Sequence, residues 1–147
     1  PEQLLELAED LLHRRNAGAP RQVVLRRASS TAYYALFHAI CLAAANRFGQ
    51  WGQPSWELVY RSVDHSAVRK QCQAAAAEDG NPLAEFARTV AELQGLRHKS
   101  DYDPLFKLSR SQCERAVATA KAALGMWNGA GIEAQRALLA RISFKQR

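Results

Sequence analysis

The segment RRASSTAYYALFHA, residues 26–39, predicts a helix with two distinct covered faces. Small and aliphatic residues recur along one face at helical spacing: Leu25, Ala28, Ala32, Leu36, Ala39 and Ala43. Polar and aromatic residues follow one another along a second face: Arg27, Ser30, Tyr34 and His38, with Arg26, Tyr33 and Phe37 beside them. We expect the first face to pack in a core and the second to line a cleft bordered by another helix or a second subunit.

The helix around this segment is predicted to be the longest in the chain. Pro20 suits a first helical position, and no further glycine or proline occurs before Gly49. An earlier helix is predicted around Leu4 to Leu12, followed by the loop RNAGAP at residues 15–20.

The rest of the chain predicts further helices separated by short breaks. They are expected to begin near Ser55, near Asp64, after the pair Asn81 and Pro82, after Ser109, and at Ile132. The helix after Pro82 is expected to end around His98, because DYDP at residues 101–104 is typical of a turn. The last two helices are expected to end near Trp127 and Phe144, and Ser109 with Gln112 forms a possible capping box.

No window of the sequence alternates as a strand does, and a length of 147 residues suits about one domain. We therefore predict a single all-α domain over residues 1–147. Its architecture is expected to be an up-and-down helical bundle of four main helices plus one or two short helices.

The chain is basic, since 20 Lys and Arg residues face 14 Asp and Glu residues for a net charge of +6. Such a surface attracts phosphate by a term that does not depend on nucleotide sequence. The same charge also lies in the range that simply keeps a small domain in solution. Charge alone leaves both interpretations open.

Several features predict a soluble cytoplasmic protein. The longest apolar run, residues 39–45, is far shorter than the roughly 20 residues that span a bilayer, and the start PEQLLELAED lacks a signal-peptide pattern. The sequence starts at Pro1 and not at Met, which is compatible with preceding residues. Cys41, Cys72 and Cys113 are expected to be reduced structural thiols. No Cys/His metal spacing occurs, so we expect no metal and no cofactor.

A second segment, LRHKSDYDP at residues 96–104, places Arg97 and His98 near a predicted helix end, where the helix dipole favours cations. His98, Asp101 and Asp103 fall within one turn, but a metal site there is not favoured because no distant ligand joins them. Taken alone, this segment does not predict a function. It becomes informative only together with residues 26–39.

Together the two segments resemble the HEPN family of helical domains. The likeness is to the branch whose long helix follows the pattern RAxSRAYYAxFHA and whose later motif is an Arg followed by a DYD-like turn. In that family an Arg followed by four to six residues and a His lies at the end of a bundle helix, and two copies face each other in a dimer. Catalytic members are metal-independent ribonucleases, and others bind RNA or act as partners in defence and toxin–antitoxin systems.

The resemblance implies a homodimer with a basic cleft that binds or processes RNA. It assigns the catalytic positions to Arg97, Tyr102 and His98, and the RNA-binding positions to Arg27, Tyr34, His38 and Asp101. Tyr102 stands where active relatives more often carry His, and Thr31 stands where the pattern often has Arg. Since a tyrosine has a reference pKa of about 10, it is a poor general base at neutral pH. The sequence therefore does not decide whether the domain cleaves RNA or only binds it.

Two other interpretations of the same residues remain. The domain is a noncatalytic module that docks a partner such as a nucleotidyltransferase antitoxin, or both segments serve only packing. In the packing interpretation the tyrosines lie in the core, His38 is half-buried and satisfied, and Arg97 sits in a buried intramolecular ion pair.

Some other residues of chemical interest receive a structural interpretation. Arg61 and His65 are interpreted as surface or interface residues. Trp51, Trp56 and Trp127 flank predicted loops, where they either plug the ends of the bundle, which we favour, or stack on bases.

Overall fold

The computed structural model describes residues 1–13 and 21–144, and these residues form helices without any strand. The seven helices are α1 (Glu2–His13), α2 (Gln22–Phe48), α3 (Pro54–Ser62), α4 (His65–Ala76), α5 (Ala84–Tyr102), α6 (Arg110–Gly129) and α7 (Ile132–Ser143). The prediction of an all-α helical bundle is confirmed. The predicted loop at residues 15–20, the first helical position of Pro20 and the last residues of the basic tail lie outside the described residues.

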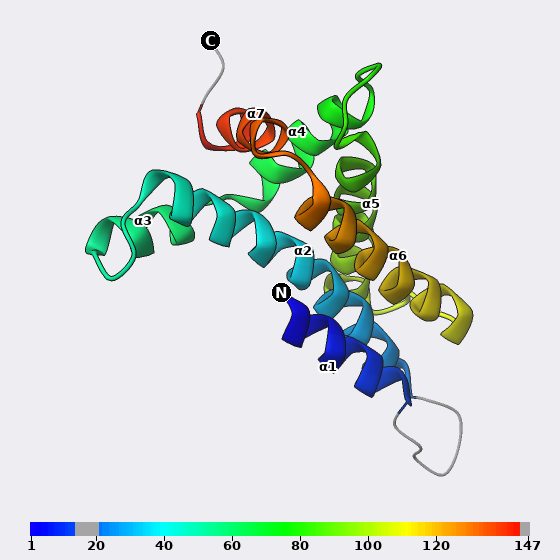
Figure 1. The fold of residues 1–147 in the computed structure, drawn as a ribbon. Coiled ribbons are helices and arrows are strands. Elements are labelled where there is room, and N and C mark those ends of the chain that lie inside the picture. Colours follow the sequence, from blue (N-terminus) through cyan, green and yellow to red (C-terminus); the bar gives the residue numbers. More distant parts are fainter. Residues whose placement is uncertain (14–20, 145–147) are drawn as a thin grey trace.

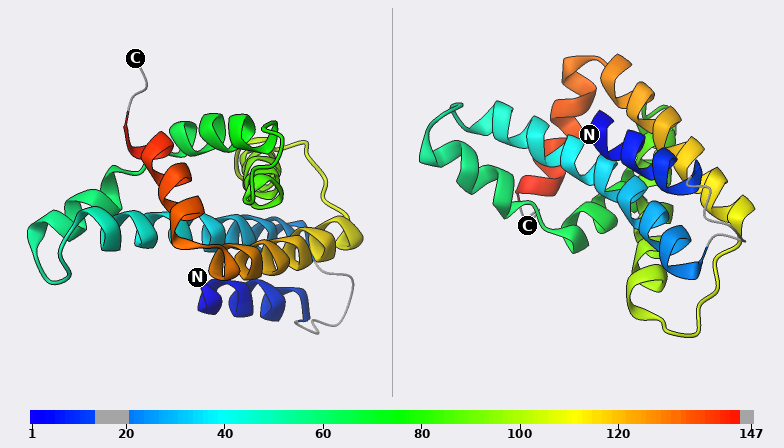
Figure 2. Two further views of the ribbon diagram at one scale, coloured as in Figure 1. Left: turned by 45° about the horizontal axis from the view of Figure 1, so that its top comes forward. Right: turned by 90° about the horizontal axis from the view of Figure 1, so that it is seen from below.

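Helix α2 is the centre of the molecule and, as predicted, its longest helix, with 27 residues. Figures 1 and 2 show α1 and α6 lying alongside it, while α5 crosses it steeply and appears nearly end-on in the left view of Figure 2. Its predicted core stripe is buried from Leu25 to Ala39. Because the stripe carries four alanines, neighbouring helices can approach its backbone closely.

The second face of α2 is covered in part: Ser30, Tyr33 and Phe37 are buried, Tyr34 and His38 are half-buried, and Arg27 is exposed. A helix that is buried over most of its surface resembles a membrane span in composition. By length and composition α2 is indeed apolar enough to cross a membrane, and 78% of its most apolar window is buried inside the protein.

Two predicted helix starts are confirmed by their caps. Asp64 accepts hydrogen bonds from the backbone amides of Ser66 and Ala67 and so caps α4. Ser109 Oγ accepts from the Gln112 amide at 3.1 Å, and the Gln112 side chain accepts from the Ser109 amide at 2.9 Å. This reciprocal pair satisfies two amides that the first turn of α6 would otherwise leave unpaired.

The predicted end of the fifth helix at His98 is wrong, because α5 continues through Asp101 to Tyr102. Pro104 disfavours helical geometry only in the residue before it, and Asp103 accordingly adopts an extended conformation as the C-cap. The segment predicted to be a turn is therefore mostly helix. At the other end, α5 begins at Ala84, slightly later than the predicted start at Pro82.

Helix α3 and the end of α2 form an arm that projects to one side of the bundle (Figures 1 and 2). Two glycines build the turn between them. A Cβ atom on Gly49 would lie 2.6 Å from the backbone Cα of Trp56, and Gly52 has a φ of 79°, which favours glycine. The arm thus depends on close backbone contact rather than on a large core.

The predicted roles of cysteine and tryptophan are confirmed in part. Cys41, Cys72 and Cys113 are free and buried, and burial raises the pKa of the Cys72 thiol to about 12. Trp127 is buried beside Phe86, with ring centroids 4.8 Å apart, and so closes the core as expected. Trp51 is 75% exposed, so the expectation that it plugs the bundle is wrong.

Candidate functional site

The two segments that carry the resemblance lie side by side, and Arg26 holds them together. Its guanidinium donates to the backbone carbonyls of Ser100 and Pro104, each at 3.4 Å, and to that of Phe106. These bonds fasten the end of α5 and the chain after it to the first turns of α2. The site is therefore built on two packed helices and not on loops alone.

Arg97 is the centre of the site. Its Nη2 donates to the Tyr34 hydroxyl at 2.7 Å. Its guanidinium carbon lies 5.4 Å from the centroid of the Tyr34 ring and 5.3 Å from that of Tyr102. Rings at this distance attract a cation through their electron-rich faces, so the two tyrosines fix the guanidinium between α2 and the last turn of α5.

An acidic residue, Asp101, forms an ion pair with Arg97. Arg97 Nε lies 2.8 Å from Asp101 Oδ2, in a contact that is not aligned as a hydrogen bond, and Ser30 Oγ donates to Asp101 Oδ1 at 2.6 Å. The Arg97 side chain is only 15% exposed, as the packing interpretation requires. However, the pair occupies only one side of the guanidinium, and Nη1 has no hydrogen-bond acceptor among the described residues.

Tyr102 and His98 lie on the outer side of Arg97. Tyr102 is 64% exposed, and its hydroxyl is 3.5 Å from Arg97 Nη2, at the limit of a hydrogen bond. The ring of His98 packs against Tyr102 with centroids 5.1 Å apart. Consecutive helical residues point about 100° apart, so His98 reaches Tyr102 and not the far side of the guanidinium.

His38 lies further along the same face of α2, beside Tyr34, with ring centroids 6.3 Å apart. Its Nδ1 is hydrogen-bonded to the hydroxyl of Tyr60 on α3, and burial lowers the pKa of its imidazole. A pKa below its usual value keeps His38 neutral at physiological pH. His38 is thus connected to Arg97 through Tyr34 and to the arm through Tyr60.

Arg27 is not brought into this cluster. It is exposed, and its guanidinium forms no hydrogen bond or ion pair with the described residues; its backbone carbonyl accepts from the hydroxyl of Thr31. Arg26, one position earlier, turns toward α5 instead. A step of one residue rotates a helical side chain by about 100°, which decides which of the two arginines faces the site.

His65 belongs to the cluster, although sequence reasoning placed it at the surface or an interface. Its ring stacks on Phe37, with centroids 3.9 Å apart, and its Nδ1 lies 2.8 Å from the Tyr33 hydroxyl. Burial, and secondarily the positive charge of Arg97, lower the pKa of His65. The Tyr33 and Phe37 rings, one helical turn apart on α2, form the slot that holds it, but no local signal names the residue that fills that slot.

The described residues contain no group of three His, Cys, Asp or Glu side chains placed to hold a metal ion. Comparison with known proteins found no matching family model, no matching curated protein and no matching solved structure. The site therefore has to be interpreted from its own chemistry: a partly buried guanidinium, two tyrosines, a carboxylate and two neutral imidazoles nearby.

Proposed function

We propose that this protein is an RNA-binding domain of the HEPN type that acts as a homodimer. The observation that supports the proposal is the environment of the Arg97 guanidinium. The aromatic rings of Tyr34 and Tyr102 hold the cation in place, and one of its terminal nitrogens has no acceptor among the described residues. A preorganised guanidinium is well suited to a phosphate, because its fork of donors matches the phosphate oxygens.

Binding has more support than cleavage. Metal-independent cleavage needs a group that takes the proton of the 2′-hydroxyl next to a cation that stabilises the phosphorane oxygens. The residue in contact with Arg97 at the expected position is Tyr102 and not histidine. The half-buried imidazoles of His38 and His65 are kept neutral by burial, but both have their Nδ1 atoms engaged by tyrosine hydroxyls.

The biological setting of the proposal comes from the resemblance. Members of the HEPN family act in defence and toxin–antitoxin systems, and we extend a bacterial setting of this kind to the present chain. In such a system the domain acts on RNA in the cytoplasm, as a ribonuclease if the site proves active.

The test is a binding and cleavage assay with labelled RNA in the presence of EDTA. The Arg97→Ala variant should bind RNA about tenfold or more weakly than wild type, and the logarithmic salt dependence of its affinity should be shallower by about one unit. The matched control is Arg110→Ala, because Arg110 also forms an i,i+4 ion pair, with Glu114, on an exposed helix face. Gel electrophoresis of the same samples shows whether the labelled RNA has been cleaved.

Two results would contradict the proposal: no RNA binding by wild type, or equal losses in the Arg97 and Arg110 variants. Cleavage by wild type and not by Arg97→Ala would establish the ribonuclease. Binding without products would leave a recognition domain.

A protein-docking function is the second candidate, and the exposure of apolar groups after Arg97 favours it. Tyr102 is 64% exposed and Leu105 is 87% exposed. A docking module predicts no affinity for RNA and loss of partner capture in Tyr34→Ala. A co-expressed nucleotidyltransferase antitoxin is the partner with which to measure that capture.

A further inference from the structure

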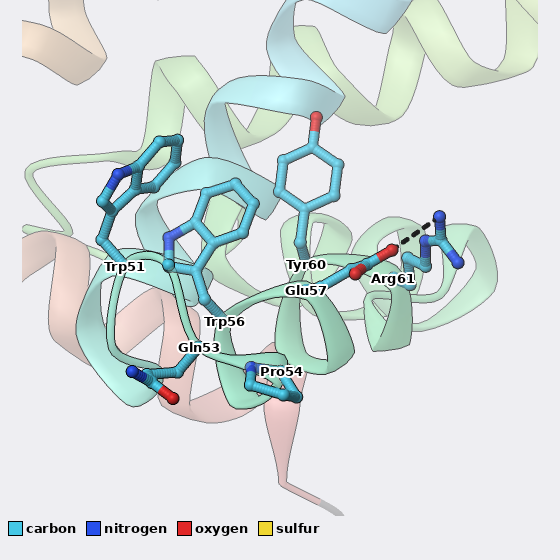
Figure 3. A pocket seen from close by; sticks show the side chains of 8 residues that line it. Trp51, Gln53, Pro54, Trp56, Glu57, Tyr60 and Arg61 are labelled. Atoms are coloured by element: carbon cyan, nitrogen blue, oxygen red, sulfur yellow. Dashed lines mark ion pairs between the residues drawn. The ribbon is translucent and has the colours of Figure 1, made fainter.

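The arm carries a row of aromatic rings that the Arg97 site does not use. The rings of Trp51 and Trp56 are 4.8 Å apart and nearly perpendicular, and Trp56 is stacked on Tyr60 at 5.2 Å with planes inclined by 17°. Figure 3 shows the three rings standing on the same side of the arm, with Gln53 and Pro54 on the other side. The three rings line an open groove of about 660 Å³, together with Gly52, Gln53, Pro54, Glu57 and Arg61.

Two of the three rings of this groove, those of Trp56 and Tyr60, are fixed by their polar ends. Trp56 Nε1 donates to Asn46 Oδ1 at 2.8 Å, and the Tyr60 hydroxyl is bonded to His38 Nδ1. Since the hydrogen-bonding groups of these two rings are already engaged inside the protein, a ligand meets the surface of the rings and not their polar ends. A rigid aromatic surface binds at low entropic cost and without dependence on nucleotide sequence.

The row continues from the groove to Arg97. Tyr60 stacks on His38 at 5.8 Å, and His38 lies 6.3 Å from Tyr34, which holds the guanidinium of Arg97. Each ring in this series is therefore a neighbour of the next. The groove and the proposed phosphate site are two ends of one continuous series of contacts.

Charge decides which kind of ligand suits this groove. The lining residues Glu57 and Arg61 neutralise each other in an ion pair of 2.7 Å, drawn dashed in Figure 3, so the groove itself is close to neutral. The whole chain carries +6. A single-stranded polyanion with flat bases matches both features, because its bases stack on the rings while its phosphates are attracted by the net positive charge of the chain.

We propose that the groove formed by Trp51, Trp56 and Tyr60 is a base-stacking subsite for single-stranded RNA. This inference rests on the proposed RNA-binding function and specifies that the bound strand has unpaired bases. Trp51, at 75% exposed, is the principal stacking ring. The subsite lies on the arm, and Tyr60 connects it to His38, one of the residues that the resemblance assigns.

The experiment compares wild type, Trp51→Ala and Trp51→Phe by fluorescence anisotropy in EDTA. The ligands are a labelled oligouridine of about twelve nucleotides, an abasic oligomer of the same length, and an RNA duplex. Trp51→Ala should bind the oligouridine about fivefold or more weakly, the loss expected for about one stacked base, while Trp51→Phe retains most of the affinity. Affinity for the abasic oligomer and for the duplex should not change.

The salt dependence separates this subsite from the phosphate site. Trp51→Ala should keep the wild-type salt slope, because no phosphate contact is lost, whereas Arg97→Ala should reduce it by about one unit. Leu58→Ala is the matched control, since Leu58 belongs to α3 of the same arm and, like Trp51, is largely exposed, at 73%, but does not line the groove.

If wild type binds RNA and Trp51→Ala binds the oligouridine equally well, the stacking subsite is wrong while the proposed function stands. If wild type binds none of the three ligands, the proposed function fails and the subsite with it. If RNA affinity is unchanged but binding of an oligoproline peptide is lost in Trp51→Ala, the groove is a peptide site and the inference is overturned.

Discussion

At the scale of single residues, Asp101 controls how readily the guanidinium of Arg97 can bind a phosphate. Its carboxylate neutralises the guanidinium and also accepts a hydrogen bond from Ser30. A phosphate approaching Arg97 therefore meets a nearby negative charge. The resemblance assigns Asp101 to RNA binding, but its position gives it the opposite electrostatic effect.

We predict that Asp101→Asn increases affinity for RNA about threefold to tenfold, because the competing charge is removed while the side chain keeps its shape. The free energy of unfolding should fall by about 1 kcal/mol or less, as for other partly exposed ion pairs. Anisotropy titrations and urea unfolding measure the two effects. Glu114→Gln, which breaks the exposed pair with Arg110, is the control and should leave RNA affinity unchanged. A decrease in the affinity of Asp101→Asn would instead assign Asp101 a direct RNA contact.

The sequence predicted some members of this site and missed others for physical reasons. The family resemblance placed Arg97 and Tyr34 in one cleft, and the two side chains are in contact between α5 and α2. The choice of Arg26 over Arg27 depends on a rotation of one residue about a helix axis, which periodicity does not fix. His65 enters from a third segment, and only the packing of α4 against α2 and α5 places it there.

At the scale of elements, local chemistry explains where helices start and end. Ser109 and Asp64 cap their helices through bonds that span three residues or fewer, so sequence alone predicts them. The end of α5 was mispredicted because the stretch after His98 contains good turn residues. There Asp101 instead pairs with Arg97 one helical turn earlier, and this pair supports the extra turn of helix.

The arm between α2 and α3 depends on Gly49 in a way that can be tested. A Cβ on this residue would lie 2.6 Å from Trp56 Cα and 2.9 Å from Trp56 N, and backbone atoms cannot rotate away. We predict that Gly49→Ala lowers the free energy of unfolding by about 1–3 kcal/mol, as overpacking generally does. Urea unfolding monitored by tryptophan fluorescence measures the change.

The matched control is Gly125→Ala in α6, where an added Cβ meets nothing within 4 Å. Since alanine favours a helix interior over glycine by about 1 kcal/mol, this variant should be stabilised. Equal effects of the two substitutions would contradict the close approach between Gly49 and Trp56. Because that contact joins residues seven positions apart across a turn, the two glycines in the sequence predict the break but not the direction of the arm.

At the scale of the whole molecule, an exposed apolar residue lies next to the Arg97 site. Leu105, at 87% exposed, follows α5 in the chain segment that Arg26 fastens to α2. A two-fold dimer through the long helix and the Arg97 region would cover Leu105 and bring two guanidinium groups to one cleft. In such an isologous interface each substitution occurs twice.

We predict that wild type sediments as a dimer and that Leu105→Glu dissociates it, raising the dimer dissociation constant about tenfold or more, because two carboxylates would be buried in the interface without partners. Ile132→Glu is the matched control: Ile132 is also apolar and 58% exposed, but it lies at the start of α7. Sedimentation velocity across a range of concentrations measures the dissociation constants. If the dimer creates the RNA cleft, Leu105→Glu should also weaken RNA binding at protein concentrations where wild type is dimeric. A monomeric wild type, or a dimer that Ile132→Glu dissociates and Leu105→Glu does not, would exclude this interface.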